Sequence, residues 1–284
     1  MKRFIGMGLI ALALVACDNE TNPLTGPGSD TDDGASTSSN EIYQGEMNNL
    51  VFDATTGEII INNLPFDGVD GRYADTGIVT VPGFGVYESQ TTGETGQFQY
   101  MAVYAEGTYT RAGAAGTGDY ASFGHGGTMI ATDGGAVAMP IMRGELIYTG
   151  DYAGIRVLDE NAGNDLLLTR GNATLIVDLL DFDVDGAILG SISGHELLDM
   201  NGNVIGTLPG IALNETSIGA DGTIAEGTTT TYDSDGDPLE TGTWGGKFAG
   251  PDGEEIVGYV IMTGDNGEST DVDAMERGVF IVVD

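Results

Sequence analysis

The sequence of 284 residues predicts an all-β protein, whose C-terminal part is an eight-stranded antiparallel β-barrel preceded by a smaller irregular β-region. Asp-Gly and Asn-Gly pairs recur between short runs rich in β-branched and aromatic residues, and such pairs are strong signals for hairpin turns. From Glu41 onward, no stretch of a dozen residues keeps an uninterrupted helical spacing of apolar side chains. The 47 glycines have no Gly-X-Y period, which excludes a collagen helix and suits strands joined by tight turns.

The composition excludes several classes of function. The 44 acidic and 9 basic residues give a formal charge of −35, so the chain lacks the basic stripe that nucleic-acid binding needs. A single cysteine excludes a disulfide framework and a thiolate zinc site. Hydrophobic residues at 40% and charged residues at 19% argue against a wholly disordered chain.

Residues 1–16 predict a lipoprotein signal peptide. Lys2 and Arg3 precede an uncharged apolar run, Phe4–Ala16, which is shorter than the roughly 20 residues of a membrane-spanning helix. The run ends in Leu-Val-Ala before Cys17, and this ending resembles the lipobox of bacterial lipoproteins. The resemblance implies cleavage before Cys17 and acylation of its thiol, which would anchor the protein to a membrane without spanning it. The alternative is an ordinary secretory signal with an incidental cysteine.

Residues 17–41 predict a disordered acidic tether. After Cys17 the segment is rich in Asp, Ser, Thr, Gly and Pro, and Leu24 is its one strongly apolar residue, so it cannot bury enough surface to become ordered. As a flexible coil it would span about 25–30 Å. Asp18 resembles the inner-membrane retention signal of enteric bacteria, a rule that varies between bacterial groups, so the choice between the inner and the outer membrane stays open.

A boundary near Pro140–Gly144 divides the remaining chain into a region at 42–142 and a region at 143–284. The strand candidates of the first region are Leu50–Phe52, Glu58–Asn62, Phe98–Tyr104 and Ala121–Ala131. The candidates of the second region are Glu145–Tyr148, Ala153–Leu158, Ala173–Leu180, Ala187–Ser193, Thr223–Tyr232, Gly242–Phe248, Glu255–Met262 and Arg277–Val283. Eight antiparallel strands that close into a barrel leave an interior filled by side chains or by one small ligand.

The most distinctive stretch of the chain is the predicted hairpin at 242–258. Trp244 and Phe248 should point to one face because strand residues alternate, and Gly246 between them leaves room for bulky neighbours. The stretch resembles the signature hairpin of the transferrin-binding protein B-like β-barrel family, in which alternating aromatics and glycines lead into Gly-Pro, an acidic pair and a Gly-led strand. The residues that carry this resemblance are Trp244, Gly246, Phe248, Gly250, Pro251, Glu254, Glu255 and Gly258. We expect the Glu254-Glu255 pair to keep that end of the hairpin soluble.

Three further stretches agree with this resemblance. Tyr148–Gly154 resembles the opening barrel strand of the family, Asn172–Asp181 its long third strand and Arg277–Phe280 its closing strand. The resemblance covers 143–284, and more loosely the preceding region at 42–142, which corresponds to the β-handle of the family. It implies a lipid-anchored binding protein, often displayed on the outer surface of Gram-negative cells, with partners bound through loops of handle and barrel. Transferrin binding itself is not implied, because those receptors are typically two-lobed and this chain has the length of one lobe.

No motif in the sequence predicts a catalytic or cofactor site. The stretch 181–186 begins like a calcium-binding EF-hand loop, but Ile192 stands where a bidentate Glu is required; a turn at Asp185-Gly186 is the better interpretation. The acidic stretch 233–237 is interpreted in the same way, with weak calcium binding as the alternative. His125 and His195, the latter expected at the start of a loop, are isolated and lack the partners of a metal site. The stretch 190–194 has Ile192 at the position of the nucleophile in a Gly-x-Ser-x-Gly elbow.

The sequence therefore predicts a non-enzymatic, lipid-anchored protein of the bacterial envelope, with the outer membrane as the favoured location. Its handle and eight-stranded barrel are expected to bind a protein or a small ligand. The alternative is a structural envelope lipoprotein without a dedicated ligand. Neither hypothesis needs a cofactor or a metal. The identity of a ligand, the face of the membrane and the oligomeric state stay open.

Overall fold

A computed structural model describes residues 40–90, 98–119, 123–133, 144–159, 166–179, 187–265 and 272–284. The predicted signal peptide, Cys17, the tether and the EF-hand-like stretch at 181–186 lie outside these ranges. The described residues form seventeen strands and one short 3₁₀ turn, η1 (Val69–Gly71). In them no helix is long and apolar enough to span a membrane.

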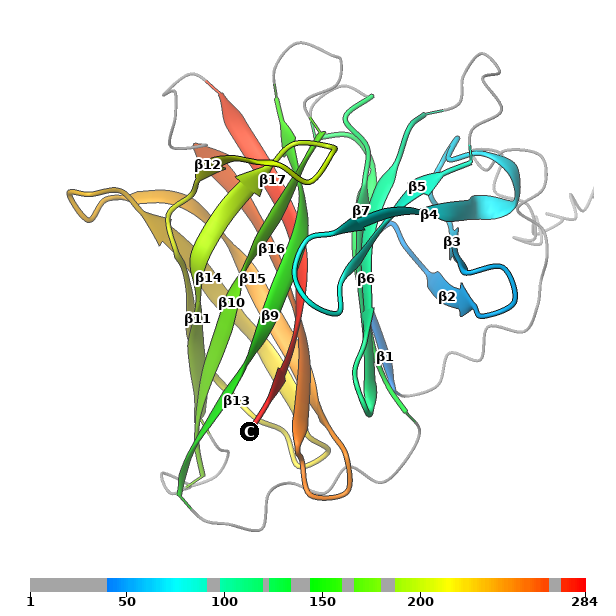
Figure 1. Ribbon diagram of the computed structural model, residues 1–284. Coiled ribbons are helices and arrows are strands. Elements are labelled where there is room, and N and C mark those ends of the chain that lie inside the picture. The colour runs from blue at the N-terminus through cyan, green and yellow to red at the C-terminus, as the bar shows by residue number, and fades with distance from the viewer. Residues whose placement is uncertain are drawn as a thin grey trace, which may run out of the picture.

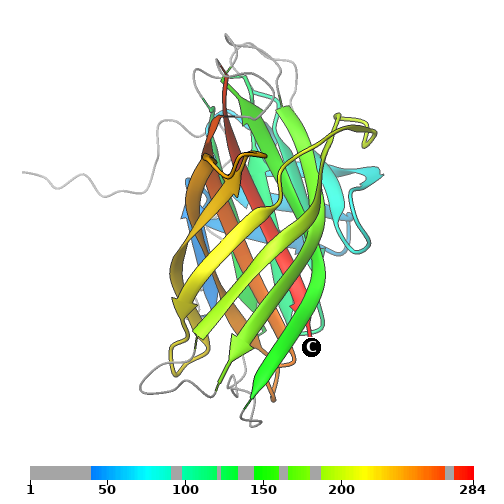
Figure 2. The same ribbon diagram turned by 90° about the vertical axis from the view of Figure 1, so that its left-hand side faces the viewer.

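The C-terminal part is a closed antiparallel barrel of eight strands, seen from its outer side in Figure 2. The strand order is β10-β9-β17-β16-β15-β14-β13-β11, and pairing between β10 and β11 closes the ring. The barrel strands are β9 (Glu145–Leu158), β10 (Leu166–Asp178), β11 (Ala187–Leu198), β13 (Ile211–Ser217), β14 (Thr223–Tyr232), β15 (Pro238–Ala249), β16 (Glu255–Asp265) and β17 (Asp273–Val283). A short strand, β12 (Val204–Thr207), pairs only with the end of β11 and lies outside the ring. The predicted fold class is confirmed.

The predicted number of barrel strands is right, but two of the predicted strands are parts of one strand, and one barrel strand was not predicted. Glu145–Tyr148 and Ala153–Leu158 belong to one strand, β9, which continues through Gly150. At that position a side chain would collide with the carbonyl group of Ile281 on β17, so glycine there permits close pairing and does not interrupt the strand. The eighth strand is instead β13, where only Ile211 and Leu213 are large apolar residues.

The N-terminal part is an eight-stranded antiparallel sheet, which we call the handle; it packs beside the barrel in Figure 1. Its order is β1-β8-β7-β6-β5-β4-β3-β2. The strands are β1 (Glu41–Gly45), β2 (Asn49–Asp53), β3 (Glu58–Asn62), β4 (Arg72–Val79), β5 (Gly85–Ser89), β6 (Met101–Glu106), β7 (Thr110–Gly116) and β8 (Gly126–Thr132). The sequence patterns found β2, β3, β6 and β8 but missed the other four strands. Strand β7 was missed because it consists largely of Ala and Gly, which have little intrinsic preference for strands.

Four of the Asp-Gly and Asn-Gly pairs lie in hairpin turns, as predicted, but these turns are not of the two-residue type I′. A two-residue type I′ turn needs positive φ at both central residues. In the four pairs at 201–202, 221–222, 235–236 and 252–253, only the glycine has positive φ. The amide of each of these glycines donates to the carbonyl oxygen three residues earlier. This pattern is that of a four-residue turn whose last residue is a glycine in the left-handed region.

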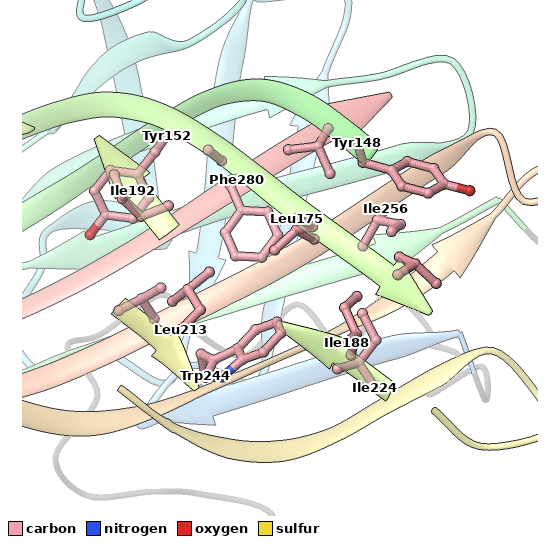
Figure 3. Packing of buried hydrophobic residues seen from close by; sticks show 14 of the residues in the cluster. Tyr148, Tyr152, Leu175, Ile188, Ile192, Leu213, Ile224, Trp244, Ile256 and Phe280 are labelled. Atoms are coloured by element: carbon pink, nitrogen blue, oxygen red, sulfur yellow. The ribbon is translucent and has the colours of Figure 1, made fainter. Parts of the chain in front are cut away.

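Buried hydrophobic residues form three clusters, and the second of them joins the two parts. The first fills the interior of the barrel with side chains from all eight strands, among them Trp244 and Phe280 (Figure 3). The second lies between the barrel and the handle and joins Ile155 and Val279 of the barrel to Val103 of the handle. The third lies on the other face of the handle sheet and includes Leu50 of β2. The handle and the barrel therefore share a core.

Candidate functional site

The signature hairpin consists of β15, β16 and the turn between them, and its large side chains point into the barrel. Trp244 and Phe248 are both fully buried, as the predicted alternation requires. The indole Nε1 of Trp244 donates to the carbonyl oxygen of Asn214 on β13 at 3.0 Å. The ring of Phe248 meets Tyr148 edge to face, with centroids 5.8 Å apart. These residues hold the barrel wall and are not accessible to a ligand.

The two strand glycines of the hairpin make room for close packing. Gly246 pairs with Gly258, and a Cβ at 246 would lie 2.5 Å from the carbonyl oxygen of Val257. A Cβ at 258 would collide with the ring of Phe280, which lies directly over the Gly258 backbone. Gly246 was predicted to leave space for bulky neighbours. In the structure Gly258 also does this, for the ring of Phe280.

The turn of the hairpin touches the handle. Gly250 has φ of +89°, and a side chain there would meet the ring of Tyr109 from the handle at 2.9 Å. Pro251 is exposed. The carboxylate of Glu254 accepts a hydrogen bond from the backbone amide of Asp252 at 3.0 Å, which closes the turn.

Glu255 is not on the surface, so the expectation that it keeps the end of the hairpin soluble is wrong. Its side chain is buried against the turn between β6 and β7 of the handle. One carboxylate oxygen accepts from the amide of Thr108 at 3.0 Å, and the other accepts from the amide of Tyr109 at 2.7 Å and the hydroxyl of Thr110 at 3.0 Å. Gly107 leaves the space that the carboxylate occupies. Glu255 therefore fastens the handle to the barrel.

Replacing Glu255 by glutamine should destabilise the protein by about 2 kcal/mol, because an amide nitrogen cannot accept the hydrogen bonds that one carboxylate oxygen now accepts. Urea denaturation measures the loss, and hydrogen exchange should show faster exchange of the Thr108 and Tyr109 amides. The matched control is Glu254→Gln in the neighbouring position, where the remaining carbonyl oxygen still caps the turn. Equal effects of the two substitutions would contradict the assigned role of Glu255.

Arg277 adds a second polar connection between barrel and handle. It lies on the outer side of β17, is 6% exposed, and its Nη1 atom lies 3.5 Å from the carbonyl oxygen of Phe123 in the handle. Burial lowers the pKa of Arg277 to about 10, so the guanidinium stays charged at neutral pH. Gln44 of β1 donates to the hydroxyl of Tyr259 on β16 at 3.1 Å. The interface is thus apolar in its centre and tied by polar contacts around it.

A buried ionic cluster lies inside the barrel near the end of β9 and centres on Glu276. One oxygen of Glu276 accepts from Tyr152 at 2.5 Å and Thr169 at 2.9 Å, and lies 3.0 Å from Nε2 of His195. The other oxygen is 2.9 Å from Nη1 of Arg156. Burial would raise the pKa of Glu276, but His195, Arg156 and the hydrogen bonds hold it well below its usual range. Glu276 is therefore a carboxylate.

Glu240 is the second carboxyl group of this cluster and is far less well compensated. One of its oxygens lies 2.9 Å from Nη1 of Arg156, in an orientation that makes no hydrogen bond. The Nη2 atom of Arg156 is buried without a hydrogen-bond partner. Burial raises the pKa of Glu240 to about 7, against the lowering effect of Arg156. This carboxyl group is therefore easily protonated near neutral pH.

The sequence did not indicate this cluster. His195 was expected at the start of a loop, but it lies within β11 with its side chain inside the barrel, 1% exposed. Strand alternation would have indicated part of the cluster. Glu276 is an even number of residues from Phe280 on β17, and Arg156 from Tyr152 on β9, so each pair shares the inner face. The four charged side chains come from four strands that only the barrel brings together. Their burial seals these acids and bases from a substrate.

The remaining stretches and residues that the sequence offered as possible sites form turns, strands or ion pairs. The carboxylate of Asp233 accepts from the backbone amides of Asp235 and Asp237 at 2.9 and 2.8 Å, and this supports the interpretation of an acidic turn. His125 lies 2.7 Å from the carboxylate of Glu46. Ile192 lies inside β11, so the stretch 190–194 is a strand and not a nucleophile elbow. In the described parts of the chain, no three His, Cys, Asp or Glu side chains form a group that could hold a metal ion.

No protein-family model matches the sequence, and no curated protein matches it. Solved structures of transferrin-binding protein B are similar to this chain. One from Haemophilus parasuis has 15% identity and a TM-score of 0.43, with 86% of this chain and 44% of that chain covered. One from Neisseria meningitidis has 14% identity and a TM-score of 0.41, with 86% and 43% covered. This chain therefore spans less than half the length of these two proteins.

A structure described as a surface lipoprotein is also similar, with 13% identity and a TM-score of 0.37. The match covers 84% of this chain and 98% of that chain. These structures carry the names of the family that the hairpin at 242–258 resembles, and the chain has the handle-plus-barrel fold that the resemblance implies.

Proposed function

We propose that this chain is a lipid-anchored, non-catalytic binding protein of the bacterial envelope, held in the outer membrane through Cys17, and that its outer surface binds a protein partner. The observation that carries this proposal is the filled interior of the barrel. The buried side chains of all eight strands form one cluster there, which includes Trp244, Phe248 and Phe280. A barrel of eight strands has room either for these side chains or for a small ligand. Because side chains fill the interior, we expect a partner to bind on the outer surface.

The attachment of the handle supports a protein partner. Glu255, Arg277 and the shared hydrophobic core fix the handle to one side of the barrel. A surface that is rigid before binding loses little conformational entropy when the partner docks, and this favours affinity. Handle and barrel together thus form one preorganised platform.

Two hairpins from the two parts meet at one edge of this platform, and both carry exposed aliphatic side chains. Val79 at the end of β4 is 61% exposed, and Val204 and Ile205 on β12 are 47% and 55% exposed. The hairpins touch, because Ile78 packs against Gly202. Exposed apolar side chains on neighbouring hairpins can contribute to a protein-binding surface. We call Val79, Val204 and Ile205 the seam surface and propose it as part of the binding face.

The location rests on the sequence at the N-terminus. The lipobox-like ending at Cys17 and the acidic segment after it lead to Asn40, whose carbonyl oxygen accepts from the amide of Thr132 on the handle. Removal of residues 1–16 leaves 7 basic and 44 acidic residues, a charge of 7 − 44 = −37. This charge keeps an anchored protein soluble outside the cell.

The proposal is tested in the native bacterium with two sets of variants. Cys17→Ser should remove the protein from the membrane fraction; unchanged membrane attachment would contradict the lipid anchor. In affinity capture, the triple variant Val79→Ser, Val204→Ser, Ile205→Ser should lose a protein that the wild type retains. Val283→Ser, which changes an equally exposed aliphatic residue at the C-terminus, should retain it. Failure of the folded wild type to retain any protein would contradict the binding function and favour a structural envelope lipoprotein.

A further inference from the structure

The side chain of His195 connects two parts of the chain that are far apart in the sequence. Its Nε2 atom lies 3.0 Å from a carboxylate oxygen of Glu276 on β17. Its Nδ1 atom lies 3.0 Å from the carbonyl oxygen of Pro209, in the connection between β12 and β13. The backbone carbonyl oxygen of His195 accepts from the amide of Leu208 at 2.8 Å. The residue thus holds the return segment of the β11–β12 hairpin against the barrel wall.

The partners of the two ring nitrogens require two protons on the ring. A peptide carbonyl oxygen can only accept a hydrogen bond, and the carboxylate of Glu276 already accepts from Tyr152 and Thr169. A neutral imidazole has one N–H group and can donate to only one of the two partners. Both contacts are hydrogen bonds only when His195 is an imidazolium.

We propose that the doubly protonated His195 is a lock that holds the β11–β12 hairpin against the barrel, and that loss of one proton releases the segment 199–208 from the barrel wall. In the neutral ring either Pro209 or Glu276 loses its donor. A lone pair of the ring nitrogen then faces an oxygen acceptor at 3.0 Å, which is repulsive. Either loss leaves an acceptor beside the buried ring without its donor, which is unfavourable.

The charges around His195 act in the same direction. Arg156 and the hydroxyl of Tyr152 face it from β9, Glu240 from β15 and Glu276 from β17. With His195 charged, two cations face two carboxyl groups inside the barrel. Once the pH has risen above the pKa of Glu240, about 7, loss of the His195 proton leaves the single cation Arg156 with two carboxylates. An uncompensated charge in this buried site is unfavourable.

The direction of the pH dependence follows from the pKa of each group. Burial would lower the pKa of His195, but Glu276 outweighs this effect, and the pKa is raised above its usual 6.5. A raised pKa means that the stabilising contribution is complete below 6.5 and is lost as the pH rises through the folded value. The pKa of Glu240, raised to about 7 mainly by burial, gives a loss in the same direction. The pKa of Glu276 is lowered, so its stabilising contribution is complete above 4.5 and is lost only as the pH falls below that value. The lock therefore opens as the pH rises above the usual pKa of histidine.

The first test measures the protonation state of the His195 ring. The chain has two histidines, so the full-length chain with His125→Gln and without a histidine tag leaves His195 as its sole imidazole. Nitrogen-15 NMR at pH 6 should show both ring nitrogens protonated, with one titration above pH 6.5. A neutral ring at pH 6 would overturn the proposal. This variant keeps His195 intact and does not depend on whether a substitution inside the barrel folds.

The second test reads the release of the hairpin. Hydrogen exchange of the full-length chain, corrected for the intrinsic pH dependence of exchange, should show protection of the amides at 203–208 falling about tenfold for each pH unit above the folded pKa of His195. Amides of β16 serve as the internal reference and should keep their protection. In His195→Gln the amides at 203–208 should be weakly protected at every pH. Protection at 203–208 that does not change with pH in the wild type would overturn the proposal.

The two tests are independent of the protein partner proposed above. The released hairpin carries Val204 and Ile205, and Gly202 on it contacts Ile78 of the handle. Opening of the lock would therefore alter the seam surface. A wild type that binds no partner but shows this exchange pattern would contradict the binding function alone, whereas a partner bound without any pH-dependent exchange would contradict the lock alone.

Discussion

Replacement of Gly258 by alanine should destabilise the barrel by about 3 kcal/mol, at the upper end of the usual cost of overpacking. A Cβ at this position would lie 2.6 Å from Cε2 of Phe280 and still closer to the end of that ring. It would also lie 2.8 Å from the carbonyl oxygen of Gly245 on the neighbouring strand. Neither the fully buried ring nor the paired strand can move without disturbing the core of the barrel.

Urea denaturation followed by fluorescence measures this loss, because the single tryptophan, Trp244, lies inside the barrel. Gly144→Ala is the matched control, since a Cβ there would meet no atom within 4 Å. The double variant Gly258→Ala, Phe280→Leu should be more stable than the sum of the two single effects, because the smaller side chain removes the collision. If Gly258→Ala had the same denaturation midpoint as Gly144→Ala, the packing of the Phe280 ring would not require glycine at position 258.

Replacement of Glu276 by glutamine should destabilise the protein by about 3–5 kcal/mol, the cost of removing one partner from a buried ion pair. Arg156 and His195 are each 1% exposed and both lie against this carboxylate. Without it, Glu240 is the one remaining carboxyl group of the cluster, and burial disfavours its ionised form. The loss should therefore be larger at pH 6 than at pH 8, where Glu240 is ionised and His195 is closer to its neutral form.

Glu196→Gln is the control for this prediction. Glu196 pairs with Arg170 at 2.7 Å, but both side chains are about one third exposed, and such surface pairs contribute about 0–1 kcal/mol. Denaturation curves of both variants at pH 6 and pH 8 provide the measurement. A similar small loss for Glu276→Gln and Glu196→Gln would mean that the cluster inside the barrel is not held by charge.

Much of the barrel could be predicted from the sequence because its strands alternate between the two faces. Trp244 and Phe248 were correctly placed on one face from their spacing, and β14 was predicted with the bounds that the structure has. The missed strand β7 shows where such patterns fail. Its small residues are needed because Ile155 of the barrel packs at 3.1 Å from the position of a Cβ at Gly116. That requirement comes from the handle–barrel interface and leaves no periodic signal.

The candidate site was predicted less well than the fold. The hairpin at 242–258 was recognised from its own residues, yet Glu255 was assigned to the solvent because an acidic pair after a turn is usually exposed. Its partners, Thr108, Tyr109 and Thr110, precede it by about 145 residues. His195 was set aside as isolated because Glu276 lies 81 residues further along the chain. Partners at such separations cannot be found from spacing alone.

The sequence by itself determined the all-β class, the place of several turns, and the shared face of Trp244 and Phe248, because alternation and turn chemistry act between neighbouring residues. The tertiary structure decided which strands close the barrel, that Glu255 binds the handle, and that His195 and Glu276 meet inside. Pairing of distant strands and burial of charge depend on the closed ring as a whole. The −35 charge of the chain gave no hint that four of its charged side chains, Arg156, His195, Glu240 and Glu276, are sealed inside that ring.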